Sequence, residues 1–237
     1  MLDTRVVTEA AGARGPFRQP SDRSSWKGHS TDTSSAVAVA VRHHPRVRTT
    51  TLGELDWQPA LDRPDLLAPP THAALLAWAQ TVPAVADLVL VAASDPGLAD
   101  TAAYVAAYRV PIEASVNCVV IAGSREGRER VGAAAIRADT RTDVNRVMRN
   151  LLGVRKCSFM PMDAAVAASG MEYGGITPIG LPADWPVYVD ARVRDVPTAL
   201  IGSGIRGSKL ILPGELLCRC PGATVVEGLA TEPPPHG

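Results

Sequence analysis

The chain has 237 residues, of which 46% are hydrophobic and 20% are charged. This composition is typical of a globular protein with one sizeable core, and no apolar run approaches the ~18 residues that a membrane span needs. The apolar stretch 36–41 lies behind a long polar segment and is too short for a secretory signal peptide, so we expect a cytoplasmic protein.

The formal net charge is zero, but the charges are unevenly distributed. Residues 1–51 contain eight Lys and Arg against four Asp and Glu, and since the whole chain has 24 of each, the remainder is mildly acidic. We therefore expect no broad basic face there, and any nucleic acid has to be bound locally.

Three segments are expected along the chain. Residues 1–51 are rich in Arg, Ser, Thr, Gly and Pro without a sustained period, which predicts a disordered or non-native extension; a basic arm for tRNA phosphates is the alternative. Residues 52–230 are predicted to form one domain, and residues 231–237 a disordered tail.

Within this domain, helices and strands interleave without a strict βαβ repeat. The pattern predicts an α/β (α+β) fold with a mixed central β-sheet surrounded by helices. Helices are expected at 72–82 (with Thr71 as N-cap), 98–108, 142–152, 162–168 and 213–218, and strands at 88–92, 116–122, 131–137, 155–159, 187–190, 198–202 and 209–212.

Histidine is scarce in the predicted domain, where His72 is the single example. A Ser-His or Cys-His catalytic pair is nearly excluded by this inventory, and the scarcity of histidine also argues against the distant alternative of a metal-dependent hydrolase. Cys118, Cys157, Cys218 and Cys220 have the spacing of neither a zinc site nor a disulfide framework, so we expect reduced thiols and no metal. A hydrolase built on this chain has to activate water in another way.

Two glycine-rich segments are candidates for a binding site. In the loop 174–180 (GGITPIG), adjacent glycines allow backbone amides to approach a ligand and Pro178 stiffens the turn; a tight crossing that needs glycine for packing is the alternative. In the segment 202–207, glycines flank Arg206 at a strand end, which suggests a guanidinium held near a phosphate or carboxylate, or else a solvated turn.

Four elements in order resemble the YbaK/EbsC family, whose members are related to the editing domain inserted in bacterial prolyl-tRNA synthetases. They are a helix ending in L-G-x-R-K at Lys156, a helix ending at Gly170, the loop 174–180, and the segment S-G-I-R-G-S-K-L at 203–210. The resemblance covers about 120 residues, from near Pro111 to Leu229.

This resemblance implies the YbaK fold and an aminoacyl-tRNA deacylase that edits in trans. Its substrate would be the aminoacylated acceptor end of a tRNA carrying a wrong, small amino acid, with an aminoacyl-tRNA synthetase as a further partner and no cofactor, metal, membrane or DNA. In the family, the G-x-x-x-P loop lines the pocket for the aminoacyl group and the terminal adenosine, and its backbone donors stabilise the oxyanion. The vicinal ribose hydroxyl of the substrate helps to position or deprotonate the water.

The residues that match the family pocket are Gly174, Gly175, Ile176 and Asn117 as the catalytic set. The substrate-binding set consists of Ser115, Thr177, Pro178, Gly180, Asp190, Ser203, Gly204 and Arg206. Asp190 can equally cap the turn that follows it. Arg155 and Lys156, with Arg146 and Arg149, form either a basic patch for the acceptor stem or ordinary surface charge.

The first pocket strand departs from the family pattern. Where many relatives have a K-T-L triplet, this chain has Asn117 at the lysine position and Cys118 at the threonine. Asparagine donates a hydrogen bond but brings no charge, which weakens binding of a phosphate. Either the chain binds its substrate with Asn117 and Ser115, or it is a catalytically silent module that binds an aminoacyl-tRNA end or an amino-acid-like ligand.

Overall fold

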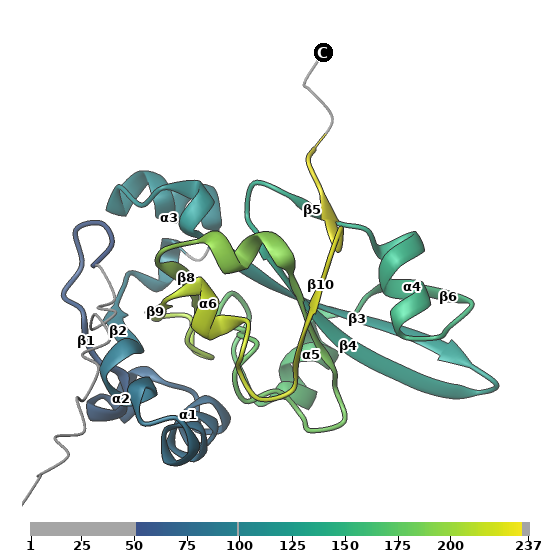
Figure 1. Cartoon of the computed structure of the whole chain (residues 1–237), viewed down its shortest axis with the longest axis horizontal. Coiled ribbons are helices and arrows are strands. Elements are labelled where there is room, and N and C mark those ends of the chain that lie inside the picture. Colours follow the sequence, from purple (N-terminus) through teal and green to yellow (C-terminus); the bar gives the residue numbers. More distant parts are fainter. Residues whose placement is uncertain (1–50, 99, 234–237) are drawn as a thin grey trace, which may run out of the picture. The chain divides into compact units, whose positions relative to one another are not determined.

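The strands form two larger sheets and one two-stranded ribbon in this computed structural model, which describes residues 51–98 and 100–233. The first sheet has the order β1-β2-β9-β8 and is antiparallel, whereas the second, β10-β7-β4-β3-β6, is mixed. The ribbon pairs β11 with β5 (Figure 1). The bounds are β1 Gln58–Pro59, β2 Leu90–Ala93, β3 Val116–Arg125, β4 Arg128–Arg137, β5 Arg141–Thr142, β6 Lys156–Phe159, β7 Val187–Asp190, β8 Ala199–Gly202, β9 Ser208–Leu212, β10 Ala223–Val226 and β11 Ala230–Thr231.

The predicted combination of a mixed sheet with surrounding helices is confirmed, but the strands divide between two sheets. Ser115 forms a parallel bridge with Leu200 of β8, immediately before β3 begins. Because this isolated bridge connects the edge of the first sheet to the start of the longest strand pair of the second, the two sheets meet at a seam. Side chains from both sheets converge there.

The five predicted helices are present with shifted ends, and the short helix α2 was not predicted. The expected helix 142–152 begins as a π-helical turn, η5 (Val144–Met148), and continues as α4 (Arg149–Leu151). The carboxylate of Asp143 caps it by accepting from the Arg146 amide at 2.9 Å. The other helices are α1 Pro69–Thr81, α2 Ala84–Leu88, α3 Thr101–Tyr108, α5 Met162–Ser169 and α6 Gly214–Leu217, with 3-10 turns η1 Ala60–Asp62, η2 Pro64–Leu66, η3 Pro96–Leu98, η4 Ile112–Ala114 and η6 Ala191–Asp195.

The start of α1 corrects the prediction that Thr71 is its N-cap. The helix begins at Pro69, because proline suits the first turn, where its missing N–H is not needed. Thr71 therefore lies inside the helix and is fully buried. By contrast, Gly170 ends α5 as expected, with the left-handed φ of 67° that favours glycine.

The hairpin of β3 and β4 is longer than predicted. The strands pair as far as Arg125 and Arg128, and a two-residue turn, Glu126-Gly127, connects them with φ values of 55° and 75°. Positive φ at both positions is the geometry that matches the twist of a tight hairpin. The charged residues between the predicted strands 116–122 and 131–137 therefore extend both strands, and the hairpin appears as the long projecting ribbon in Figure 1.

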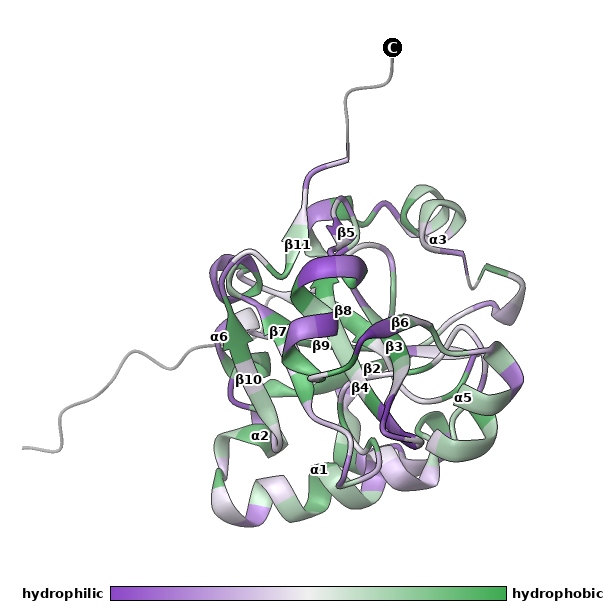
Figure 2. Ribbon diagram, turned by 90° about the vertical axis from the view of Figure 1, so that its right-hand side faces the viewer, coloured by the Kyte–Doolittle hydropathy of each residue, from purple (hydrophilic) through white to green (hydrophobic). Residues whose placement is uncertain are grey.

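Apolar side chains fill both faces of the strands. The largest buried cluster packs α1, α2 and α6 against β2, β7, β8 and β9, and a second covers β3 and β4 beneath η5 and α4. Figure 2 shows the hydrophobic residues concentrated on the central strands. Between residues 51 and 233, with residue 99 set aside, no helix combines the length and hydropathy of a membrane span.

The predicted terminal segments lie largely outside the described residues. Residues 1–50 and 234–237 are not described, so disorder of these segments stays a prediction. Thr231 is a correction to the predicted tail, because it pairs with Arg141 in the ribbon of β5 and β11. Leu229 and Ala230, both buried, hold this part of the chain against the domain.

Two adjacent leucines of α1 provide a test of this packing. Leu75 is fully buried, whereas Leu76 is 44% exposed. We expect Leu75→Ala to lower the free energy of unfolding by about 2–4 kcal/mol, because it leaves a cavity, and Leu76→Ala to change it by less than about 0.5 kcal/mol. Urea denaturation measures both values. Equal losses in the two variants would contradict the orientation of α1.

Candidate functional site

A cavity of about 490 Å³ lies at the seam between the two sheets, beside the N-terminal end of α3. Its walls come from segments that are far apart in the sequence: Gly97 with Asp100 and Thr101, the first residues of β3, the loop around residue 174, the end of β8, and the start of β9. The lining residues are Gly97, Asp100, Thr101, Val116, Asn117, Cys118, Val119, Tyr173, Gly174, Ile176, Gly202, Arg206 and Lys209.

Four of the predicted site residues meet in this cavity. Asn117, Gly174, Ile176 and Arg206 all line it, although up to 89 positions separate them in the sequence. The Asn117 side chain accepts a hydrogen bond from Thr101 Oγ1 at 3.2 Å, through its Oδ1 atom. Its amide nitrogen has no partner among the described residues, so it remains a donor for a ligand.

Gly175 does not line the cavity, and its amide is already used. The Gly175 N–H donates to the Glu172 carbonyl at 2.9 Å, and the Gly175 carbonyl accepts from the Gly204 N–H at 2.8 Å. A Cβ atom at Gly175 would lie 2.4 Å from the Ile205 carbonyl oxygen. The catalytic role expected for Gly175 is thus replaced by the alternative of close backbone packing.

Gly174 and Ile176 have backbone amides that are free to donate to a ligand. Both residues line the cavity, and neither backbone N–H donates a hydrogen bond to any described residue. Gly174 has a φ of 79°, which a residue with a side chain adopts only with strain. Two unpaired amides at one wall can stabilise an oxyanion or bind another small anion.

The remaining loop residues, Thr177, Pro178 and Gly180, pack against the rest of the fold and do not line the cavity. Thr177 and Pro178 are buried, and the Thr177 N–H donates to the Met171 sulfur at 3.5 Å. Gly180, with a φ of 89°, passes so close to α1 that a Cβ atom would lie 2.5 Å from the Pro70 carbonyl oxygen. The structure therefore gives these three residues packing contacts and does not bring them to the cavity.

Ser203 and Gly204 also do not line the cavity and make packing contacts instead. The hydroxyl groups of Ser203 and Ser208 are 2.6 Å apart and fully buried, and Ser208 donates onward to the Leu66 carbonyl. A Cβ atom at Gly204 would lie 2.4 Å from the Ala68 Cβ. These contacts fix the turn that carries Arg206.

Ser115 lies next to the main cavity. It lines a smaller space of about 30 Å³ together with Asn117, Lys209 and their neighbours. Its hydroxyl is buried and has no hydrogen-bond partner among the described residues. Such an unsatisfied hydroxyl is costly in a folded protein, which makes Ser115 a candidate to contact a bound molecule or water.

Asp190 follows the alternative interpretation, in which it caps a turn. It is absent from the cavity lining, and its buried carboxylate accepts from the amides of Arg192 and Ala230 and from the Arg192 guanidinium at 2.8 Å. Burial by itself raises the pKa of Asp190, but these hydrogen bonds outweigh it and bring the pKa below its ordinary value. Its hydrogen-bonding capacity is thus committed to holding η6 and β11.

Arg206 lies at the edge of the cavity and is only partly buried. Its Nε donates to the Pro96 carbonyl at 2.6 Å, and its backbone N–H donates to Glu172 Oε2 at 2.7 Å. The guanidinium carbon is 5.7 Å from the centroid of the Tyr173 ring. No carboxylate among the described residues forms an ion pair with this guanidinium, so it can bind an anionic ligand.

Lys209 is a cavity residue that the sequence analysis did not assign to the site. It is only 8% exposed, and its Nζ donates to the Gly174 carbonyl at 2.9 Å. Burial and the nearby charge of Arg206 lower the pKa of Lys209 to about 8. The signal available in the sequence was a lysine inside the apolar strand 208–212, where a charged side chain needs a reason to be present.

The cavity contains no histidine, because His72 in α1 is not among its lining residues. Within the described ranges, no group of three or more His, Cys, Asp or Glu side chains is placed to hold a metal ion. Cys118 lines the cavity, but burial and then the proximity of Cys220 raise the pKa of its thiol to about 12. The neutral thiol is a poor nucleophile at physiological pH.

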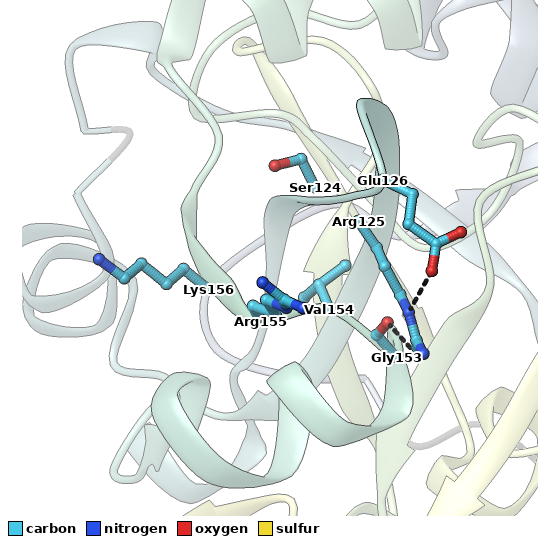
Figure 3. A pocket seen from close by; sticks show the side chains of 7 residues that line it. All are labelled: Ser124, Arg125, Glu126, Gly153, Val154, Arg155 and Lys156. Carbon is cyan, nitrogen blue, oxygen red and sulfur yellow. Dashed lines mark hydrogen bonds and ion pairs between the residues drawn. The ribbon is translucent and has the colours of Figure 1, made fainter.

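A second cavity, of about 600 Å³, lies between the tip of the β3–β4 hairpin and residues 153–156. We call it the basic notch, because Arg125, Arg155 and Lys156 line it (Figure 3). Figure 3 shows Arg125 reaching towards Gly153, with Lys156 extending away from the other side chains. Of the four cations predicted to form one patch, Arg146 and Arg149 do not line the notch; Arg146 pairs with Asp143.

The sequence of the chain matches one family model. Residues 95–220, more than half of the chain, match the family described as aminoacyl-tRNA editing domain. A comparison with curated proteins gives no match.

Solved structures share the fold at low sequence identity. The hypothetical protein APE2540 superposes with a TM-score of 0.57 and 19% identity, over 67% of this chain and 99% of that one. A candidate trans-editing enzyme for prolyl tRNA synthetase superposes with a TM-score of 0.56 and 17% identity, over 70% of this chain and 99% of that one. Both likenesses support the mixed fold with its surrounding helices.

The hydrogen-bonded carboxylate of Asp190 predicts a pH-dependent contribution to the free energy of unfolding. Since the folded state lowers its pKa, the stabilisation is present above the ordinary value of about 4 and is lost as the pH falls through the folded value. We expect Asp190→Asn to lower the free energy of unfolding at neutral pH by about 1.5–3 kcal/mol, towards the lower end because Arg192 is 36% exposed.

Asp195 is the matched control, since it lies in the same turn η6 and is exposed. Urea denaturation at several pH values should show a loss for Asp190→Asn that shrinks below pH ~4, and little change for Asp195→Asn. A loss of the same size at every pH would contradict this role of the carboxylate.

Proposed function

This chain belongs to the aminoacyl-tRNA editing domain family, and we propose that it is an aminoacyl-tRNA deacylase that acts in trans on a mischarged tRNA carrying a small amino acid. The proposed reaction is hydrolysis of the ester bond between the amino acid and the terminal ribose. Aminoacyl-tRNA is used in the cytoplasm, so the proposal carries the expectation of a cytoplasmic protein.

One observation carries the proposal: the amides of Gly174 and Ile176 are unpaired and line the same cavity as Asn117 and Arg206. When water adds to an ester carbonyl, the negative charge develops on the carbonyl oxygen, and preorganised N–H donors stabilise it. Arg206 at the edge is suited to a phosphate of the terminal nucleotide, and the amide nitrogen of Asn117 to a polar group of the substrate.

The size of the cavity supports a small amino acid as the edited group. About 490 Å³ has to hold both the aminoacyl group and part of the terminal nucleotide. A pocket rejects a side chain that is too large more strongly than one that lacks a methylene. Correctly attached larger residues would thus be protected from hydrolysis, as editing requires.

The partners follow from the same proposal. The acceptor end of an aminoacylated tRNA would enter the cavity, and an aminoacyl-tRNA synthetase is a further partner. A solved structure of similar fold is that of a candidate trans-editing enzyme for prolyl tRNA synthetase. This likeness supports a synthetase partner for the present chain.

A deacylation panel tests the function. Purified protein is incubated with tRNAs carrying Ala, Ser, Cys or their correct amino acids, and ester loss is compared with spontaneous hydrolysis. We expect turnover of at least one small mischarged amino acid. Binding without turnover, with turnover appearing in Asn117→Lys, would instead identify a silent binding module.

Gly174→Val is expected to reduce deacylation by about 100-fold or more, because it alters the backbone at a position that lines the cavity and thereby displaces one oxyanion donor. Gly127→Val in the hairpin turn is the matched control: its φ of 75° is close to the 79° of Gly174, and a Cβ atom there has no neighbour within 4 Å. Both variants suffer similar backbone strain. Equal activity of the two variants would refute the role of Gly174.

The basic notch is proposed to bind phosphates of the acceptor stem. We expect Arg155→Ala/Lys156→Ala to weaken tRNA binding and to reduce the magnitude of the slope of log affinity against log salt by about 1–2. The reason is that fewer phosphate contacts mean that fewer counterions are released when the tRNA binds. Hydrolysis of a short aminoacyl-adenosine ester should be unchanged. Filter binding at several salt concentrations measures the slope.

The control for the notch is Arg109→Ala/Arg219→Ala, which removes the same charge from exposed sites outside it. If this variant weakens tRNA binding equally, the effect is one of total charge. The notch would then not be a specific tRNA contact.

A further inference from the structure

Lys209 occupies a position where a lysine is costly. It lies in β9, where the next three residues, Leu210, Ile211 and Leu212, are fully buried, and it is itself only 8% exposed. Transfer of an ammonium group out of water carries a large free-energy cost unless another group compensates its charge. The surroundings of Lys209 therefore indicate whether that compensation is complete.

The compensation within the protein is incomplete. The Nζ atom donates to the Gly174 carbonyl at 2.9 Å and lies 5.6 Å from the centroid of the Tyr104 ring. No carboxylate within residues 51–98 and 100–233 forms an ion pair with it. An ammonium group has three donors, so at least one N–H is left for a molecule in the cavity that Lys209 lines.

We propose that the Lys209 ammonium donates a hydrogen bond to the ester carbonyl oxygen of the bound aminoacyl group and stabilises the oxyanion, together with the amides of Gly174 and Ile176. This inference rests on the proposed deacylase function. It supplies a cationic group from β9, whereas the strand position that carries lysine in many relatives has Asn117. The positive charge therefore enters the pocket from a different strand.

The chemical step is a simple ester hydrolysis. The water oxygen forms a bond to the carbonyl carbon, and the π electron pair moves to the carbonyl oxygen, which becomes the oxyanion beside Lys209. The electron pair then returns, the bond to the ribose oxygen breaks, and that oxygen takes up the proton that the water has lost. The products are the free amino acid and a tRNA with a free terminal hydroxyl.

Lys209 is more deeply buried than Arg206, and this difference favours the ester carbonyl over a phosphate as the partner of Lys209. A phosphate is large, doubly or singly charged and strongly hydrated, and Arg206 at the edge of the cavity can hold it with a planar fork of donors. Lys209 lies deeper and contacts the carbonyl of Gly174, the residue whose own N–H is an oxyanion donor. The two cations therefore have separate tasks.

The charged groups around Lys209 do not neutralise it. Asp100 lines the same cavity, but its carboxylate caps α3 by accepting from the amides of Ala102 and Ala103. Glu172 is exposed and accepts from the Arg206 N–H. Burial raises the pKa values of Tyr104 and Cys118, so both remain neutral.

The protonation state of Lys209 makes the proposal testable by pH. Burial and the charge of Arg206 lower its pKa to about 8, so the cation is present below this pH and is lost as the pH rises through it. A cation that stabilises the oxyanion accelerates the reaction only in its protonated form. A general base would show the opposite dependence.

The experiment compares deacylation by the wild type, Lys209→Met and Lys209→Arg from about pH 6 to about pH 10, with spontaneous hydrolysis subtracted. Rates are expressed as ratios to the wild type, so that titration of the substrate amino group cancels. At the lowest pH we expect Lys209→Met to lose about 100-fold in kcat with little change in KM. This advantage of the wild type should decline as the pH passes about 8.

Lys209→Arg keeps its charge to a much higher pH, so its activity relative to the wild type should rise above pH ~8. Arg219→Met, which removes an exposed charge, should match the wild type throughout. An active wild type with an equally active Lys209→Met, or a wild-type advantage that grows with pH, would overturn the inference alone. A wild type that hydrolyses none of the esters would overturn the proposed function as well.

Discussion

The close approach of two glycine-containing backbones is the constraint on which the rest of the site depends. The Gly175 carbonyl accepts from the Gly204 N–H, and a Cβ atom at Gly202 would lie 2.3 Å from the same carbonyl oxygen. Only residues without a side chain permit this contact. It places the neighbouring amides of Gly174 and Ile176 at the cavity wall and brings the Gly174 carbonyl to Lys209.

The electrostatic character of the cavity follows from this packing. Its two lining cations, Arg206 and Lys209, have no ion-pair partner among the described residues, and its one lining carboxylate, that of Asp100, is engaged by the end of α3. Buried or half-buried cations without acids stabilise negative charge when it appears. The fold thus maintains two cavity cations that are available to an anionic ligand.

The sequence analysis assigned to one pocket several residues that the structure places around one cavity. Asn117, Gly174, Ile176 and Arg206 were assigned to one pocket, and the structure brings them together. Gly175 and Asp190 were assigned to it as well, but one packs against Ile205 and the other caps η6. Motifs identify segments that approach each other; they do not show which member of a segment faces the cavity, since that depends on the backbone angles of the turn.

What the sequence determined by itself was local: the order of helices and strands, the glycine-rich loop with its proline, and a histidine inventory that disfavours imidazole catalysis. Only the tertiary structure decided which amides stay unpaired and that Lys209 lies beside Gly174. The reason is that hydrogen-bond pairing and the pKa of a buried group depend on contacts between distant segments. Such contacts arise only when the two sheets meet at their seam.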